Sequence, residues 1–117
     1  MNTHKPCTRT WGYALPLFLA LSLLKAEEKP LPAVEIHFID RHFVPQTVPV
    51  PTGTELILKV TNDSHERIEF ESFKLNRERV VEAGHTLVLH LPALKKGSYD
   101  FFDDFHGDVP QGEIVAQ

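Results

Sequence analysis

The chain has 117 residues, with 12 Lys and Arg against 16 Asp and Glu, and a formal net charge of −4. This length allows one domain. An acidic chain without clustered Lys and Arg is unsuited to nucleic acid, which requires such clusters, whereas a negative charge favours the attraction of cations.

The first 26 residues have the three regions of a secretory signal peptide. The first nine contain two bases and no acid, residues 11–24 are almost continuously apolar, and Ala26 is a small residue suited to cleavage, with Ala20 as an alternative. A membrane anchor is the other interpretation, but about 20 apolar residues are needed to span the hydrocarbon core. Pro16 interrupts a run that is already shorter. We therefore expect export, with cleavage near Ala26.

Cleavage at this point would change the composition of the mature chain. The only cysteine, Cys7, would leave with the signal, together with three of the twelve basic residues, so that nine bases face sixteen acids and the net charge is −7. The mature chain would have no disulfide, no thiolate ligand and no membrane span. Because a domain of about 90 residues is close to the lower limit for an adequate core, a bound metal would help to stabilise it.

Alternation of apolar and polar residues predicts an all-β domain at 34–117, after a linker at 27–33. Such alternation is typical of half-buried strands. It is clearest at four stretches, namely 34–38, 56–60, 86–91 and 99–102. Turn residues separate these stretches. Roughly seven short strands in this length predict a sandwich or a barrel, and of these two we expect a Greek-key β-sandwich.

Two stretches are less regular. Residues 43–50 contain Pro45 and Pro49, which a central strand would not tolerate, so we expect an edge strand there. Within residues 71–82 we expect a short helical turn near 74–77.

The most informative motif lies at 97–115 and reads GSYDFFDDFHGDVPQGEIV. It resembles the closing strand, ligand loop and final strand of cupredoxins, which follow G-x-Y-x-F-x-C-x-x-H and then G-x-x-x-V. Gly97, Tyr99 and Phe101 match the first three positions, and His106 matches the histidine. Asp103 stands where the copper-binding cysteine is expected.

The loop around Asp103 is a candidate metal site. Asp103 shares the parity of Tyr99 and Phe101, so its carboxylate faces inward and needs a partner or a cation. His106 can offer an imidazole to the same point, and Asp104 adds charge. We predict that Asp103, Asp104 and His106 are metal ligands; the alternative is that the acids cap turns beside a surface histidine.

Residues 62–72 resemble the cupredoxin segment that supplies the first histidine ligand, but Ile68 stands at that position. Glu69 and Glu71 flank Phe70 and are predicted as additional ligands. They could instead form the solvated side of a strand. Glu78, in an R-E-R run, ranks below them because it is also typical of a surface ion pair.

The motifs in combination resemble one branch of the cupredoxins. E-F-E-S at 69–72, R-E-R-V at 77–80 and F-F-D-D-F-H at 101–106 are similar to the cupredoxin-like domain of periplasmic ferrous-iron uptake systems (EfeO-type), over about residues 34–116. The resemblance implies copper or iron as the bound ion and an iron permease, or another periplasmic iron-uptake component, as the partner. It also implies an accessory role in Fe(II) oxidation.

Two functions follow from these observations. The first is a periplasmic metal-binding protein that supports ferrous-iron uptake, without a blue-copper centre, because that centre requires a thiolate. The second is a metal-free structural or interaction domain that docks on a transport partner. The sequence shows no serine nucleophile elbow, paired acid/base motif or cofactor loop that would indicate an independent enzyme.

Overall fold

The computed structural model describes residues 3–4, 12–14, 16 and 29–117. The predicted signal peptide (1–26), with its cleavage point near Ala26, falls largely outside the described residues and stays a prediction. No helix within the described ranges is long and apolar enough to cross a membrane. Between Ala33 and Ala116 the chain forms nine strands: β1 (Ala33–Ile39), β2 (His42–Val44), β3 (Thr47–Val50), β4 (Leu56–Asn62), β5 (Ile68–Ser72), β6 (Arg77–Val81), β7 (Thr86–Leu91), β8 (Gly97–Asp103) and β9 (Gly112–Ala116).

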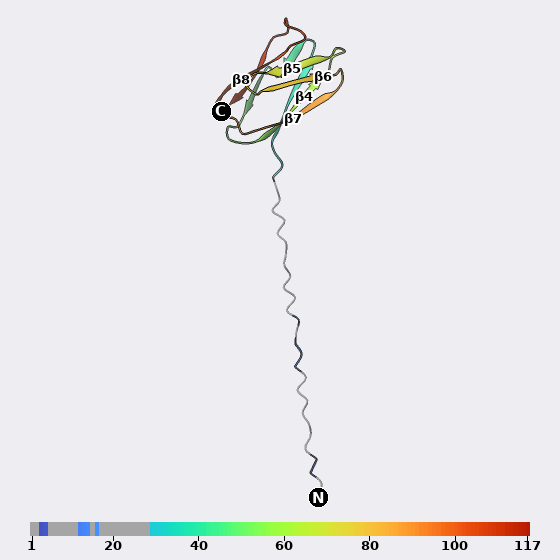
Figure 1. Cartoon of the computed structure of the whole chain (residues 1–117), viewed down its shortest axis with the longest axis vertical. Helices are drawn as coiled ribbons and strands as arrows, with labels where there is room; N and C mark the ends of the chain where they lie inside the picture. Colours follow the sequence, from blue (N-terminus) through green and yellow to red (C-terminus); the bar gives the residue numbers. More distant parts are fainter. Residues whose placement is uncertain (1–2, 5–11, 15, 17–28) are drawn as a thin grey trace.

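The strands form two sheets that enclose one core (Figure 1). One sheet has the order β2-β1-β4-β7 and the other the order β3-β9-β8-β5-β6. β1 pairs with β4 and β3 pairs with β9 in parallel, and the other pairs are antiparallel. The predicted all-β Greek-key sandwich is confirmed.

The two irregular stretches differ from the prediction in detail. Residues 43–50 do lie at a sheet edge, but a bend at Pro45 divides them, so that β2 and β3 are edge strands of different sheets. The helical turn expected near 74–77 is wrong. Residues 73–76 form a single turn closed by the Asn76 N–H and the Phe73 carbonyl, 3.1 Å apart. Asn76 has a φ of 53°, a value that Asn tolerates and that ends a turn, so Arg77 begins β6.

Phenylalanine rings fill the core beneath the last strands. Phe101 is fully buried and meets Phe43 edge-on at a centroid distance of 5.0 Å and Phe70 at 5.3 Å. These contacts fix the inward face of β8 and β5. This packing also fixes the ends of the two strands, including Asp103 at the end of β8.

A buried asparagine fixes the loop that leads into β5. Asn62 has no exposed surface, and its amide nitrogen donates to the carbonyls of Glu66 and Val81 at 2.7 and 2.9 Å. Its side-chain oxygen accepts the N–H and the hydroxyl of Ser64. The loop is therefore tied to the sandwich from within, which sets the position of Glu66.

Candidate metal centre

Asp103 is the buried end of β8. It is 1% exposed, as the alternation with Tyr99 and Phe101 predicts. Its Oδ1 accepts the backbone N–H groups of Glu69 and Phe105, each at 3.0 Å. Because Glu69 belongs to β5, this carboxylate joins the end of β8 to the neighbouring strand.

His106 lies between two carboxylates. Its Nδ1 is 2.5 Å from Asp103 Oδ2 and its Nε2 is 3.0 Å from Glu66 Oε2. The imidazole is 22% exposed. Both ring nitrogens therefore face protein oxygens, so a metal ion at either nitrogen would have to displace one of these contacts.

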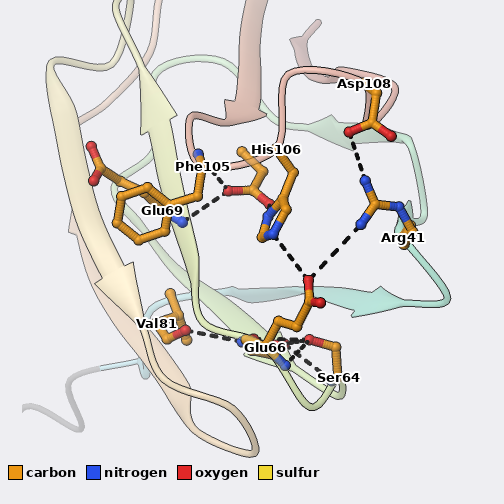
Figure 2. Close-up of polar contacts among 10 residues, drawn as sticks. Arg41, Ser64, Glu66, Glu69, Val81, Phe105, His106 and Asp108 are labelled. Carbon is orange, nitrogen blue, oxygen red and sulfur yellow. Dashed lines mark hydrogen bonds and ion pairs between the residues drawn. The ribbon is translucent and has the colours of Figure 1, made fainter.

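The polar contacts of His106 continue from Glu66 to Arg41 and Asp108 (Figure 2). Glu66 Oε2 is 3.9 Å from Arg41 Nη1, and Arg41 Nη2 donates to Asp108 Oδ1 at 2.6 Å. The guanidinium beside Asp108 holds the pKa of that carboxyl below its usual value. Arg41 occupies this place because Asp40 and Arg41 form the two-residue loop between β1 and β2, both with positive φ (49° and 61°), as a type I′ hairpin requires.

A second group lies on the outer face of the five-stranded sheet. Carboxylate oxygens of Glu69, Glu71 and Asp104 lie within 4.8 Å of one another. Glu69 and Glu71 alternate with buried Ile68 and Phe70 along β5, and Asp104 immediately follows β8. The Asp104 N–H donates to the Glu69 carbonyl at 3.0 Å. Glu69 is only 9% exposed, so it is not a freely solvated side chain.

The outer carboxylates raise one another's pKa. The pKa of Glu69 is raised to about 7, first by a hydrogen bond with the Glu78 carboxyl, then by burial and by repulsion from Glu78, Asp104 and Glu71. The pKa of Glu71 is also raised, by burial and then by repulsion from Glu78 and Asp104. Glu78 lies directly opposite Glu71 in the pairing of β5 with β6. Like charges in this position are destabilising, and a cation among them would reverse the sign of the interaction.

The structure thus separates the five predicted ligands into two groups. Glu69, Glu71 and Asp104 form the outer group, which we name the carboxylate cluster. Asp103 and His106 lie on the core side of the strand end. That these five residues are metal ligands stays a prediction from the sequence.

Sequence reasoning did not identify every residue of these groups. Glu78 ranked below the other acids because its R-E-R run is typical of a surface ion pair; its pairing with Glu71 depends on the turn at 73–76, which the sequence pattern did not predict. Glu66 and Arg41 were not predicted at all, because they come from loops that are distant in sequence and no motif links them to His106.

The sequence model of the cupredoxin-like domain matches residues 12–116. The chain belongs to the cupredoxin-like domain family. An uncharacterized protein of Rickettsia prowazekii (strain Madrid E), RP394, is 40% identical over 83 residues, which are 71% of this chain and 66% of that protein. The matched region therefore spans just under two thirds of this relative.

Solved cupredoxins have the same fold. A purple cupredoxin from Nitrosopumilus maritimus aligns with a TM-score of 0.58 at 16% identity, covering 72% of this chain and 99% of that one. Auracyanin A, a "blue" copper protein from Chloroflexus aurantiacus, gives 0.62 at 12% identity, with 75% and 100% covered. The metal-binding domain of the Cu(I)-exporting ATPase CopA from Streptococcus pneumoniae D39 gives 0.64 at 11% identity, with 77% and 89% covered. The cupredoxin fold expected from the motifs is confirmed.

This chain therefore has the cupredoxin sandwich, but it lacks the copper-binding cysteine that the motif places at the end of β8. Asp103 and its hydrogen bonds stand where the resemblance places the cysteine, and no cysteine or methionine occurs at 29–117. The donors that remain are carboxylate and imidazole. These suit Cu(II), Fe(II), Fe(III), Mn(II) or Zn(II) and exclude a blue-copper centre.

Proposed function

We propose that this cupredoxin-like protein binds a copper or iron ion at the carboxylate cluster. The observation behind the proposal is a cluster of carboxyl groups that has no basic partner. Within the part of the chain that the structure describes, no Lys or Arg forms an ion pair with Glu69, Glu71, Asp104 or Glu78. Every cause that acts on the pKa of Glu69 raises it. A bound cation would supply the missing positive charge.

The donors favour some ions over others. Three or four carboxylates form a hard, anionic oxygen site. Such a site suits Cu(II) and both oxidation states of iron better than Cu(I), which prefers thiolate and thioether sulfur. The CopA domain is described with Cu(I), but residues 29–117 of this chain offer no sulfur ligand.

We further propose a role in periplasmic ferrous-iron uptake. Support comes from the resemblance of the motifs at 69–72, 77–80 and 101–106 to the EfeO-type branch, and from the signal-like first 26 residues. In this role the protein would bind the ion outside the inner membrane and serve an iron permease or another uptake component. Anionic carboxylate oxygens bind Fe(III) more tightly than Fe(II), which would favour the oxidised ion and suits an accessory part in Fe(II) oxidation.

Calorimetric titration tests the metal site. Cu(II), and Fe(II) under anaerobic conditions, are titrated into the parent protein and into the variants Glu69→Gln and Glu71→Gln, with Glu35→Gln on β1 of the other sheet as the matched control. We expect each cluster variant to weaken binding about tenfold or more, which corresponds to about 1.4 kcal/mol, and the control to bind like the parent. If the parent does not bind, or all four proteins bind equally, the metal proposal fails and the metal-free interaction domain becomes the better explanation.

A further inference from the structure

We propose that Asp103 and His106 are positioning residues, which hold the backbone of the carboxylate cluster and do not touch the ion. In this assignment a chain of hydrogen bonds occupies the place that the cupredoxin motif gives to copper and its thiolate. The inference rests on the proposed function of the carboxylate cluster, and it deepens that function by separating the residues that bind from those that support them.

The direction of the side chains separates Asp103 from the carboxylate cluster. Consecutive residues at a strand end point to opposite faces of the sheet. Asp103 continues the buried face of β8, whereas Asp104 joins Glu69 and Glu71 on the outer face. The Asp103 carboxylate cannot reach the same ion without a rotation of the strand end, which the packing of Phe101 against Phe43 and Phe70 opposes.

The hydrogen bonds of Asp103 lead to the backbone of the carboxylate cluster. One of its oxygens accepts the N–H of Glu69, and the next residue, Asp104, donates its own N–H to the Glu69 carbonyl. The peptide groups on both sides of the Glu69 Cα are thus bonded to residues 103 and 104. Glu69 and Asp104, two members of the carboxylate cluster, are therefore fixed relative to each other through Asp103.

Both ring nitrogens of His106 already have protein partners. Its two nitrogens face Asp103 at 2.5 Å and Glu66 at 3.0 Å. The backbone carbonyl of Glu66 accepts a hydrogen bond from the Asn62 amide, and the Glu66 carboxylate faces Arg41 (Figure 2). The imidazole thereby provides the partner that a buried carboxylate needs, and it fixes the orientation of the Asp103 carboxylate.

The test compares removal of the Asp103 side chain with a conservative replacement. In Asp103→Asn the amide oxygen can accept the same two N–H groups, and the amide nitrogen can donate to His106 Nδ1. We expect Cu(II) affinity, measured by calorimetry, to fall about 10–100-fold in Asp103→Ala and to stay within about threefold of the parent in Asp103→Asn. Glu69→Gln should weaken Cu(II) binding whether or not Asp103 is a positioning residue, because it removes a proposed ligand.

Electron paramagnetic resonance of the Cu(II) complex provides an independent readout. We expect an oxygen-ligated spectrum in the parent, without nitrogen couplings, and the same spectrum in His106→Gln and Asp103→Asn. If Asp103→Ala does not fold, as judged by circular dichroism, the comparison of the parent with Asp103→Asn and His106→Gln decides the question.

The outcomes separate the two proposals. The positioning role is overturned if Asp103→Asn loses as much affinity as Glu69→Gln, if a folded Asp103→Ala binds like the parent, or if imidazole couplings in the parent disappear in His106→Gln. In each of these cases the metal-binding proposal stands as long as Glu69→Gln still weakens binding. Unchanged binding by Glu69→Gln refutes the proposed function itself.

Discussion

Replacement of Gly112 by alanine should be strongly destabilising. Gly112 opens β9 opposite Phe101, and a Cβ atom at this position would lie 2.3 and 2.4 Å from two ring carbons of Phe101 and 2.8 Å from the Gln46 carbonyl oxygen. Ordinary contacts are at least 3.4 Å. The ring would have to retreat by about 1 Å, but Phe43 and Phe70 pack against it.

The expected cost follows from this geometry. One extra methyl group in a well-packed core costs about 1–3 kcal/mol. We expect about 3 kcal/mol here, because one of the close atoms belongs to the backbone and accepts a 2.8 Å hydrogen bond from Glu113 N–H. For a domain of this size that corresponds to a decrease in Tm of about 12–24 °C.

Urea denaturation of Gly112→Ala measures this cost against a matched control. Gly107 has no atom within 4 Å of an added Cβ, so Gly107→Ala should stay within about 0.5 kcal/mol of the parent. Adding Phe101→Leu to Gly112→Ala should cost less than the two single changes together, because the smaller side chain makes room for the methyl group. A loss below about 1 kcal/mol, or strict additivity of the two changes, would refute the steric argument.

Three further predictions concern charge, polarity and ligands. The pKa of Glu69 is raised to about 7 from 4.5, so the folded chain binds this proton more tightly than the unfolded chain. The free energy of unfolding should therefore fall as the pH rises from about 4.5 to 7. Urea titrations at several pH values should show a smaller dependence on pH for Glu69→Gln than for the parent. Asn62→Ala leaves the buried Val81 carbonyl without its side-chain donor and should cost about 1–3 kcal/mol in chemical denaturation; an unchanged midpoint would contradict this. The Cu(II)-loaded protein should show no strong absorption band near about 600 nm, since residues 29–117 contain no cysteine and a blue-copper centre requires a thiolate; an intense blue colour would mean that the ligands are misassigned.

Alternation along the strands correctly predicted which side chains are buried and which lie on the opposite face. Alternation placed Phe101 and Asp103 on the buried face of β8, and the structure leaves them 0% and 1% exposed. The same rule placed Glu69 and Glu71 on the face opposite Phe70. These predictions succeed because side-chain direction along a strand depends on local geometry alone.

Contacts between distant segments could not be predicted in this way. Glu66 meets His106 only because the loop after β4 folds over the end of β8, and Arg41 reaches Glu66 from a hairpin of the other sheet. Such encounters depend on sheet order and loop path, for which a single sequence contains no periodic signal. The division of the five predicted ligands into two groups is a consequence of the same tertiary arrangement.

The hydrogen-bonded aspartate at the end of β8 also bears on chemical durability. Redox-active iron and copper generate oxidants, and thiolates exposed to them proceed through sulfenic to sulfinic and sulfonic acids, the last of which is irreversible. A carboxylate has no step on that pathway. With Asp103 in the position that the motif gives to cysteine, and with neither cysteine nor methionine anywhere in residues 29–117, the domain can meet such metals repeatedly without sulfur oxidation damaging its own strand end.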